Sequence, residues 1–174
     1  MRAVMPMGEN IQTMQIQDSG KADETIRIEA FQSAGLVAHT RILARIAQSE
    51  TDEMRVVALA TATILMASAA LEAVLSEAAY ILNQSLYKTR KFRKSGAPDK
   101  FEQLTGHSSQ EATALWNARI AVAHAEPDNS RTRFVGMKLN AQGAEWAANC
   151  IIKLSKEVWG ASMPEWFSET IGIA

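Results

Sequence analysis

The chain has 174 residues, a formal net charge of −1, 47% hydrophobic residues and 21% charged residues. These values fit one globular domain with a sizeable core and exclude a disordered chain. A nearly neutral chain does not attract a polyanion as a whole, so any nucleic-acid site must be a local patch. Cys150 is the single cysteine, which excludes an intrachain disulfide and a cysteine zinc cluster. Its neighbours Ile151 and Ile152 predict a buried thiol.

Residues 1–30 are interpreted as an N-terminal arm or short hairpin, and residues 31–174 as a single helical domain. The alternation Ile26-Arg27-Ile28-Glu29 predicts a short strand. A hairpin that pairs 11–17 with 25–30 therefore competes with a disordered arm. No apolar segment follows the basic residue near the N-terminus, so we expect no signal peptide and a cytoplasmic location.

Two helices are predicted over residues 33–48 and 53–86, with Asp52 or Thr51 as the cap of the second. The second is rich in Ala, Leu and Met and, at about 1.5 Å per residue, spans about 50 Å, so it is expected to be the central helix. Its stretch Val56–Leu71 is uncharged for 16 residues. A membrane span needs about 20 residues, so we interpret this stretch as part of a core helix and expect no membrane partner.

The most basic stretch is Lys88-Thr89-Arg90-Lys91-Phe92-Arg93-Lys94, which holds five positive charges in seven residues and no acid. Cations neutralise phosphates and an aromatic ring can stack on an unpaired base, so this composition suits RNA. The alternative is a solvated helix end, because cations at a helix C-terminus complement its dipole. The candidate nucleic-acid-binding residues are Lys88, Arg90, Lys91, Phe92, Arg93 and Lys94.

Three more helices complete an all-α, up-and-down bundle of four to five helices. A short helix is predicted over 98–104, and a longer one over 109–124, where Ser108 and Glu111 have the spacing of a capping box. The last long helix is predicted over 141–159 from apolar residues at steps of four. We expect the apolar tail that follows it to fold onto the bundle or onto a partner chain.

The helix over 109–124 carries Arg119 within it and His124 at its end. Metal-free RNA cleavage requires a base for the 2′-OH, a cation for the phosphoryl oxygens and an acid for the leaving 5′-oxygen, tasks that suit histidine and arginine. Five residues turn an ideal helix by about 500°, so these two side chains point about 140° apart. Asn117 shares a stripe with His124 and is a candidate to orient its imidazole or to contact a phosphate. Since one histidine does not readily serve as both base and acid, a two-fold homodimer is expected.

Arg119 and His124, as Arg-x4-His at the end of a helix, resemble the motif of the HEPN superfamily of small helical proteins. The likeness covers roughly residues 30–160 by helix order and includes the preceding Ala-rich helix with its Glu72. The resemblance implies an active site built across a dimer interface and a role for Glu72 in orienting Arg119. The alternative for Glu72 is a rim carboxylate paired with a base from another helix. Ile120 departs from the family's pattern, in which the residue after the arginine is commonly polar.

We therefore expect an RNA-binding protein and metal-independent endoribonuclease of the toxin–antitoxin or phage-defence type, with Arg119, His124 and Asn117 as catalytic residues. RNA, a second copy of the chain and a cognate antitoxin or other partner protein are the expected partners. No metal or cofactor is expected, because three dispersed histidines without paired cysteines do not make a zinc site. The alternative, which Ile120 favours, is a non-catalytic helical dimer that binds a protein or a nucleotide. In that case His124 only complements the helix dipole.

Overall fold

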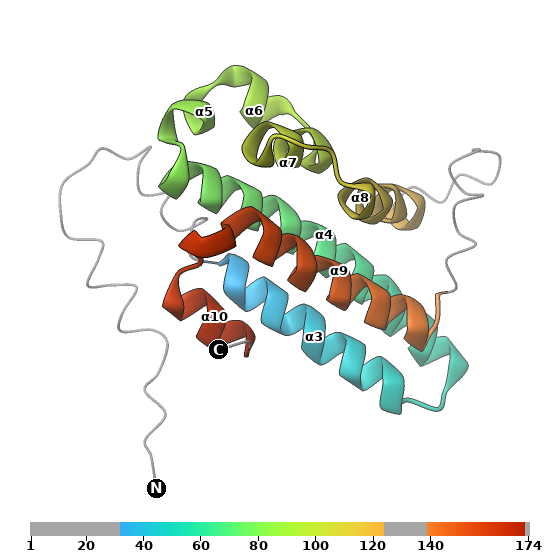
Figure 1. Cartoon of the computed structure of the whole chain (residues 1–174). Helices are drawn as coiled ribbons and strands as arrows, with labels where there is room; N and C mark the ends of the chain where they lie inside the picture. Colours follow the sequence, from blue (N-terminus) through green and yellow to red (C-terminus); the bar gives the residue numbers. More distant parts are fainter. Residues whose placement is uncertain (1–31, 124–138, 173–174) are drawn as a thin grey trace, which may run out of the picture.

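The protein is built from three long helices that lie side by side and a layer of shorter helices that crosses them (Figure 1). The computed structural model describes residues 32–123 and 139–172, and every regular element within these ranges is helical, which confirms the all-α prediction. The hairpin or arm predicted over residues 1–30 lies outside the described residues. The elements are α3 (Ser33–Ser49), α4 (Glu53–Leu82), α5 (Gln84–Lys88), α6 (Arg90–Lys94), α7 (Ala97–Thr105), α8 (Gln110–Ala123), α9 (Ala141–Trp159), η3 (Gly160–Ser162) and α10 (Glu165–Ile171).

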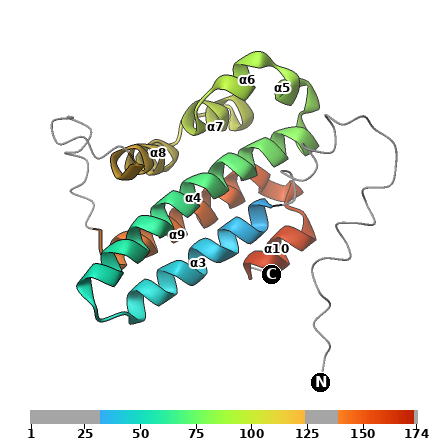
Figure 2. The same ribbon diagram turned by 180° about the vertical axis from the view of Figure 1, so that it is seen from behind.

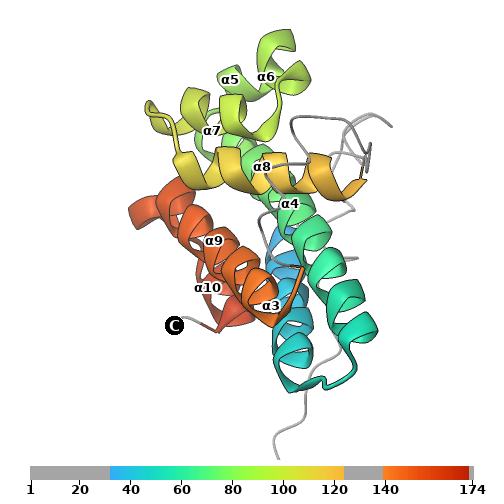
Figure 3. The same ribbon diagram turned by 90° about the vertical axis from the view of Figure 1, so that its right-hand side faces the viewer.

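Helices α3, α4 and α9 form the bundle. Each packs against the other two, and α10 covers the side of α3. Helix α8 does not run alongside them but crosses α4 and α9, as Figure 3 shows. The up-and-down arrangement therefore holds for the three long helices, while the helix that carries Arg119 lies across the outside of the bundle. The apolar tail, as α10, folds onto the bundle through Phe167 and Ile171, which are buried in its main core.

Helix α4 begins where the sequence predicts and ends earlier than the predicted residue 86. The carboxylate of Asp52 accepts a backbone N–H of its first turn at 3.1 Å. The helix ends at Leu82 because Asn83 leaves the helical region, with φ −147°, and its side-chain oxygen accepts the N–H of Leu86 at 3.1 Å. Asparagine side chains compete with helix continuation in this way, so a new short helix begins.

The other predicted helices are confirmed closely, since 33–48, 98–104 and 141–159 correspond to α3, α7 and α9. The cap of α8 is Ser109, not Ser108 as predicted, because the Ser109 hydroxyl accepts the N–H of Ala112 at 3.2 Å. The thiol of Cys150 is buried as predicted, and burial raises its pKa to about 11.

The main core lies where α4 meets α3, α9 and the crossing helices, and its largest members include Phe101, Leu115, Trp159 and Phe167. A second, smaller cluster at the other end of the bundle consists of Ala44, Ala47, Ala60, Ala144 and Ala148. Small side chains there let α3, α4 and α9 approach closely, whereas the main core is filled by aromatic and branched residues.

Helix α4 is long and apolar enough, by length and composition, to cross a membrane, with a mean hydropathy of 1.8. Helices α3, α7, α8 and α9 pack against its sides, which is the position of a central bundle helix, and such helices meet the same criterion. No other described helix covers α4 on the side that Figure 2 presents, and α4 bears exposed apolar residues. Met54, Val57 and Leu65 are 78%, 38% and 37% exposed.

One carboxylate is buried in the core. Glu77 of α4 is 1% exposed and accepts a short hydrogen bond from the hydroxyl of Ser33, the first residue of α3. Its other oxygen has no hydrogen-bond partner among the described residues. Burial raises the pKa of the Glu77 carboxyl to about 7, while the hydrogen bonds from Ser33 oppose that rise. The start of α3 is therefore attached to α4 through a carboxyl group that titrates near neutral pH.

Candidate nucleic-acid interface

Five cations are exposed on α5, α6 and the residues between them: Lys88, Arg90, Lys91, Arg93 and Lys94. Thr89 separates the two helices, because its hydroxyl accepts the N–H of Phe92 at 3.1 Å and caps α6. None of the five forms an ion pair with a carboxylate in residues 32–123 or 139–172. Three of them also lie in the last turn of α6, where they complement its dipole. Their exposure and free charge are what phosphate binding requires.

Phe92 corrects part of the prediction for this basic run. Its ring is 1% exposed, so it is not available to stack on a base. The ammonium of Lys100 lies 5.8 Å from the ring centroid. A buried aromatic ring attaches α6 to the protein, so the cations around it are held on a fixed helix.

Glu72 is a carboxylate paired with a base from another helix, which is the alternative to the orienting role. One of its carboxylate oxygens accepts a hydrogen bond from the Lys100 ammonium at 2.7 Å, and Lys100 is nearly buried. This ion pair joins α4 to α7. No described contact joins Glu72 to Arg119, so the structure does not assign Glu72 the orienting role that the family resemblance implies.

Arg119 contacts an aromatic ring that in turn packs against the loop after the basic run. Its guanidinium carbon is 4.8 Å from the ring centroid of Trp116, one turn earlier on α8. The Trp116 ring in turn lies against Gly96, where an added Cβ would come within 3.3 Å of the ring. Gly96 closely follows Lys94, the last residue of the run. Folding therefore places the arginine of α8 one indole ring away from Gly96, two residues after the basic run.

Asn117 lies on a different side of α8 from Arg119. Residues two positions apart in a helix are separated by about 200° around the axis. Helix α8 is regular through Ala123, so this holds for Asn117 and Arg119. Arg119 is exposed and Asn117 partly buried. The structure does not bring these two candidates together, and His124 lies outside the described residues.

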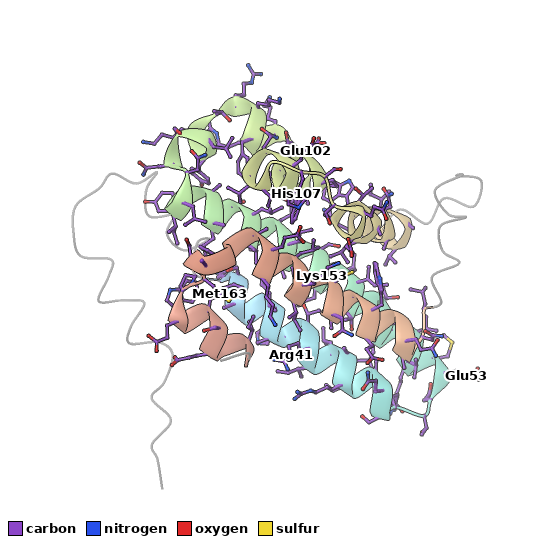
Figure 4. All side chains as sticks on the ribbon, viewed as in Figure 1. Arg41, Glu53, Glu102, His107, Lys153 and Met163 are labelled. Atoms are coloured by element: carbon purple, nitrogen blue, oxygen red, sulfur yellow. The ribbon has the colours of Figure 1, made fainter. Side chains whose placement is uncertain are left out.

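A hollow of about 410 Å³ adjoins the basic run and is open to solvent. Lys91 and Ser95 line one side, and Asp99, Glu102 and Gln103 of α7 line the other. Glu102, labelled in Figure 4, is exposed on α7. Two carboxylates therefore border the basic run on this side and limit how far a polyanion can extend across α7.

The sequence contained no signal for the contacts of His107, which joins the α7–α8 turn to α9. Its Nε2 lies 2.6 Å from a carboxylate oxygen of Glu157, a residue 50 positions away. That hydrogen bond raises the pKa of His107, and a further hydrogen bond to the Thr105 backbone acts in the same direction. Glu111 of α8 bonds to Lys153 of α9 nearby, which lowers the pKa of Glu111. Figure 4 labels His107 and Lys153, and these contacts assign His107 to structure.

The chemistry of the interface is that of cations and hydrogen-bond donors. No group of three or more His, Cys, Asp or Glu side chains that could hold a metal ion occurs in the two described ranges. His39 is an exposed residue of α3. The chain matches no family model, and no curated protein or solved structure matches it significantly.

Proposed function

We propose that this protein binds single-stranded RNA and cleaves it without a metal, as a HEPN-like endoribonuclease of the toxin–antitoxin or phage-defence type. The observation that supports binding is the set of five exposed cations on α5 and α6, together with Arg119 over Trp116, whose ring packs against Gly96 two residues after the last of those cations. We define these five, Lys88, Arg90, Lys91, Arg93 and Lys94, together with Arg119, as the cationic surface. The cations on α5 and α6 neutralise the phosphates, and Arg119 meets one phosphate of the same strand.

In the proposed reaction, a base removes the 2′-OH proton of one nucleotide. Its 2′-oxygen then attacks the phosphorus attached to the 3′-oxygen of the same nucleotide. The phosphorus–5′-oxygen bond breaks, and an acid protonates that leaving oxygen. Arg119 stabilises the negative charge that develops on the phosphoryl oxygens. His124 acts in proton transfer, and a second His124 from a two-fold partner supplies the other proton-transfer group.

Loss of phosphate contacts is the direct test of binding. Replacing Lys91, Arg93 and Lys94 together by glutamine is expected to weaken RNA binding and to flatten the plot of log affinity against log salt. Each lost single-strand phosphate contact lowers the slope by up to about 0.7. Fluorescence anisotropy of a labelled oligouridine at several salt concentrations measures both quantities. A triple variant with the wild-type slope would remove α6 from the cationic surface.

A non-catalytic dimer that binds a protein or a nucleotide is the second candidate function. Two observations favour it, namely Ile120 in place of a polar residue after Arg119 and the exposed apolar face of α4. Met54, Val57 and Leu65 on that face could contact a second copy of the chain. Thus the two candidates place the dimer interface on different helices, the first on α8 and the second on α4.

The interface can be located with two matched variants. Ile120 lies on α8 and is partly exposed, and Leu65 lies on the open face of α4 with a comparable apolar side chain. Under the first proposal Ile120→Glu is expected to give monomers, because a carboxylate is costly in an apolar interface, while Leu65→Glu stays dimeric. Sedimentation at micromolar concentration distinguishes them. The opposite result would assign the dimer to α4 and favour the second candidate.

A further inference from the structure

We infer that Trp116 and Arg119 form a stacking platform for one unpaired base of the bound RNA. This inference rests on the proposed RNA binding and adds a base contact to it. A platform needs a flat group, a fixed position and one open face. At this point on α8 the structure supplies a guanidinium over an indole ring, packing that fixes the ring, and an exposed arginine.

The indole is fixed from below. The Trp116 side chain is partly buried and packs against the main core, and its ring edge lies against Gly96. A side chain larger than glycine at position 96 would require the ring to shift, since its Cβ would approach the ring within 3.3 Å. The sequence therefore provides a place for this ring in the loop before α7.

The guanidinium is the upper layer of the platform. Arg119 lies over the ring, 4.8 Å from its centroid, and forms no ion pair with a described carboxylate. Arg119 is also exposed, so its side chain is accessible to a base. A planar cation on an aromatic ring presents a surface on which a base can stack, while its N–H groups at the edge remain free for a phosphate.

The position of the platform suits a strand already bound to α6. Its lower layer adjoins Gly96, directly after the cationic helix. The run itself offers no exposed aromatic ring, because Phe92, its single aromatic residue, is buried. Stacking tolerates any base, so the ligand class is single-stranded RNA without strong sequence preference. Duplex RNA, whose bases are already stacked, is not expected to use the platform.

The test compares two ligands that carry equal numbers of phosphates, an oligouridine and an abasic ribose-phosphate chain of the same length. The wild-type protein is expected to prefer the oligouridine by about 5- to 150-fold, the usual effect of stacking one base. Arg119→Lys keeps the charge but loses the plane, and Trp116→Leu removes the lower layer, so both are expected to lose most of this preference. Arg45→Lys, at an exposed position of α3, is the control and is expected to keep the preference for the oligouridine.

The outcomes separate the two levels of the proposal. Equal binding of both ligands by the wild type, with a steep salt dependence, would overturn the platform and leave the cationic surface intact. An Arg119→Lys protein that keeps the full preference would overturn it as well. If the wild type binds neither ligand, the proposed RNA binding fails and the platform fails with it. Circular dichroism of the Trp116→Leu protein checks that a lost preference does not come from unfolding.

Discussion

Arg119→Ala is expected to lower metal-free RNA cleavage by about 10²- to 10³-fold, the usual effect of removing one group that stabilises transition-state charge. His124→Ala is expected to lower it by about 10²- to 10⁴-fold, because it removes a proton-transfer group. The measurement is cleavage of total RNA and of an oligouridine in EDTA, by purified wild-type and variant proteins. EDTA excludes cleavage by a contaminating metal-dependent nuclease.

The same variants are expected to stay folded. Arg119 is exposed, and its loss removes a cation–π contact worth about 0.5–1 kcal/mol at an exposed site. Thermal melts and sedimentation therefore accompany the activity measurements, with exposed Arg45→Ala as the control. Folded, dimeric and inactive variants would support the assigned roles. Variants that cleave RNA at the wild-type rate would show that Arg119 and His124 only complete the end of a helix.

Glu77→Gln is expected to remove most of the pH dependence of stability near neutral pH. Burial raises the pKa of Glu77 from the ordinary value of 4.5 to about 7, which corresponds to about 3 kcal/mol between its two protonation states. For a protein of this size that free energy is worth roughly 6–12 °C in melting temperature. The amide of glutamine has nearly the same shape as the carboxyl group and stays neutral.

The sign of the effect follows from the raised pKa. The folded protein binds this proton more tightly than the unfolded chain, so the stabilisation is fully present below about pH 4.5. It is lost as pH rises through about 7, where the buried Glu77 carboxyl becomes charged at the start of α3. His107 changes stability in the same direction, because its pKa is also raised, but it is 55% exposed and its contribution is small.

Melting temperatures of wild type and Glu77→Gln from pH 5 to pH 8 measure this difference. The melting temperature of the variant is expected to rise steadily relative to that of the wild type as the pH increases from 5 to 8. Glu145→Gln, which neutralises an exposed carboxylate of α9, is the matched control and is expected to follow the wild type. Parallel curves for wild type and Glu77→Gln would mean that the Glu77 carboxyl does not titrate in this range.

The sequence by itself determined the features that depend on neighbouring residues. The bounds of α3, α7 and α9 follow from periodic apolar residues and from caps such as Asn140, whose side chain accepts the N–H of Gly143 at 3.0 Å. The exposure of the cationic run was also readable, because five charges in seven residues cannot all be buried. The roles of Arg119 and His124 were also proposed from the sequence, and both stay predictions.

Only the tertiary structure decided which residues far apart in the chain meet. Lys100 pairs with Glu72, which lies 28 residues away in the sequence, and Ser33 donates a hydrogen bond to Glu77, which lies 44 residues away. Helix period alone did not show that Phe92 points into the protein while Trp116 reaches Gly96. The physical reason is that caps and periodicity act within one or two turns, whereas burial and ion pairing depend on which helix faces pack together. The partner of Glu72 was therefore set by the packing of α7 on α4, and the position of the Trp116 ring by the crossing of α8 over the bundle.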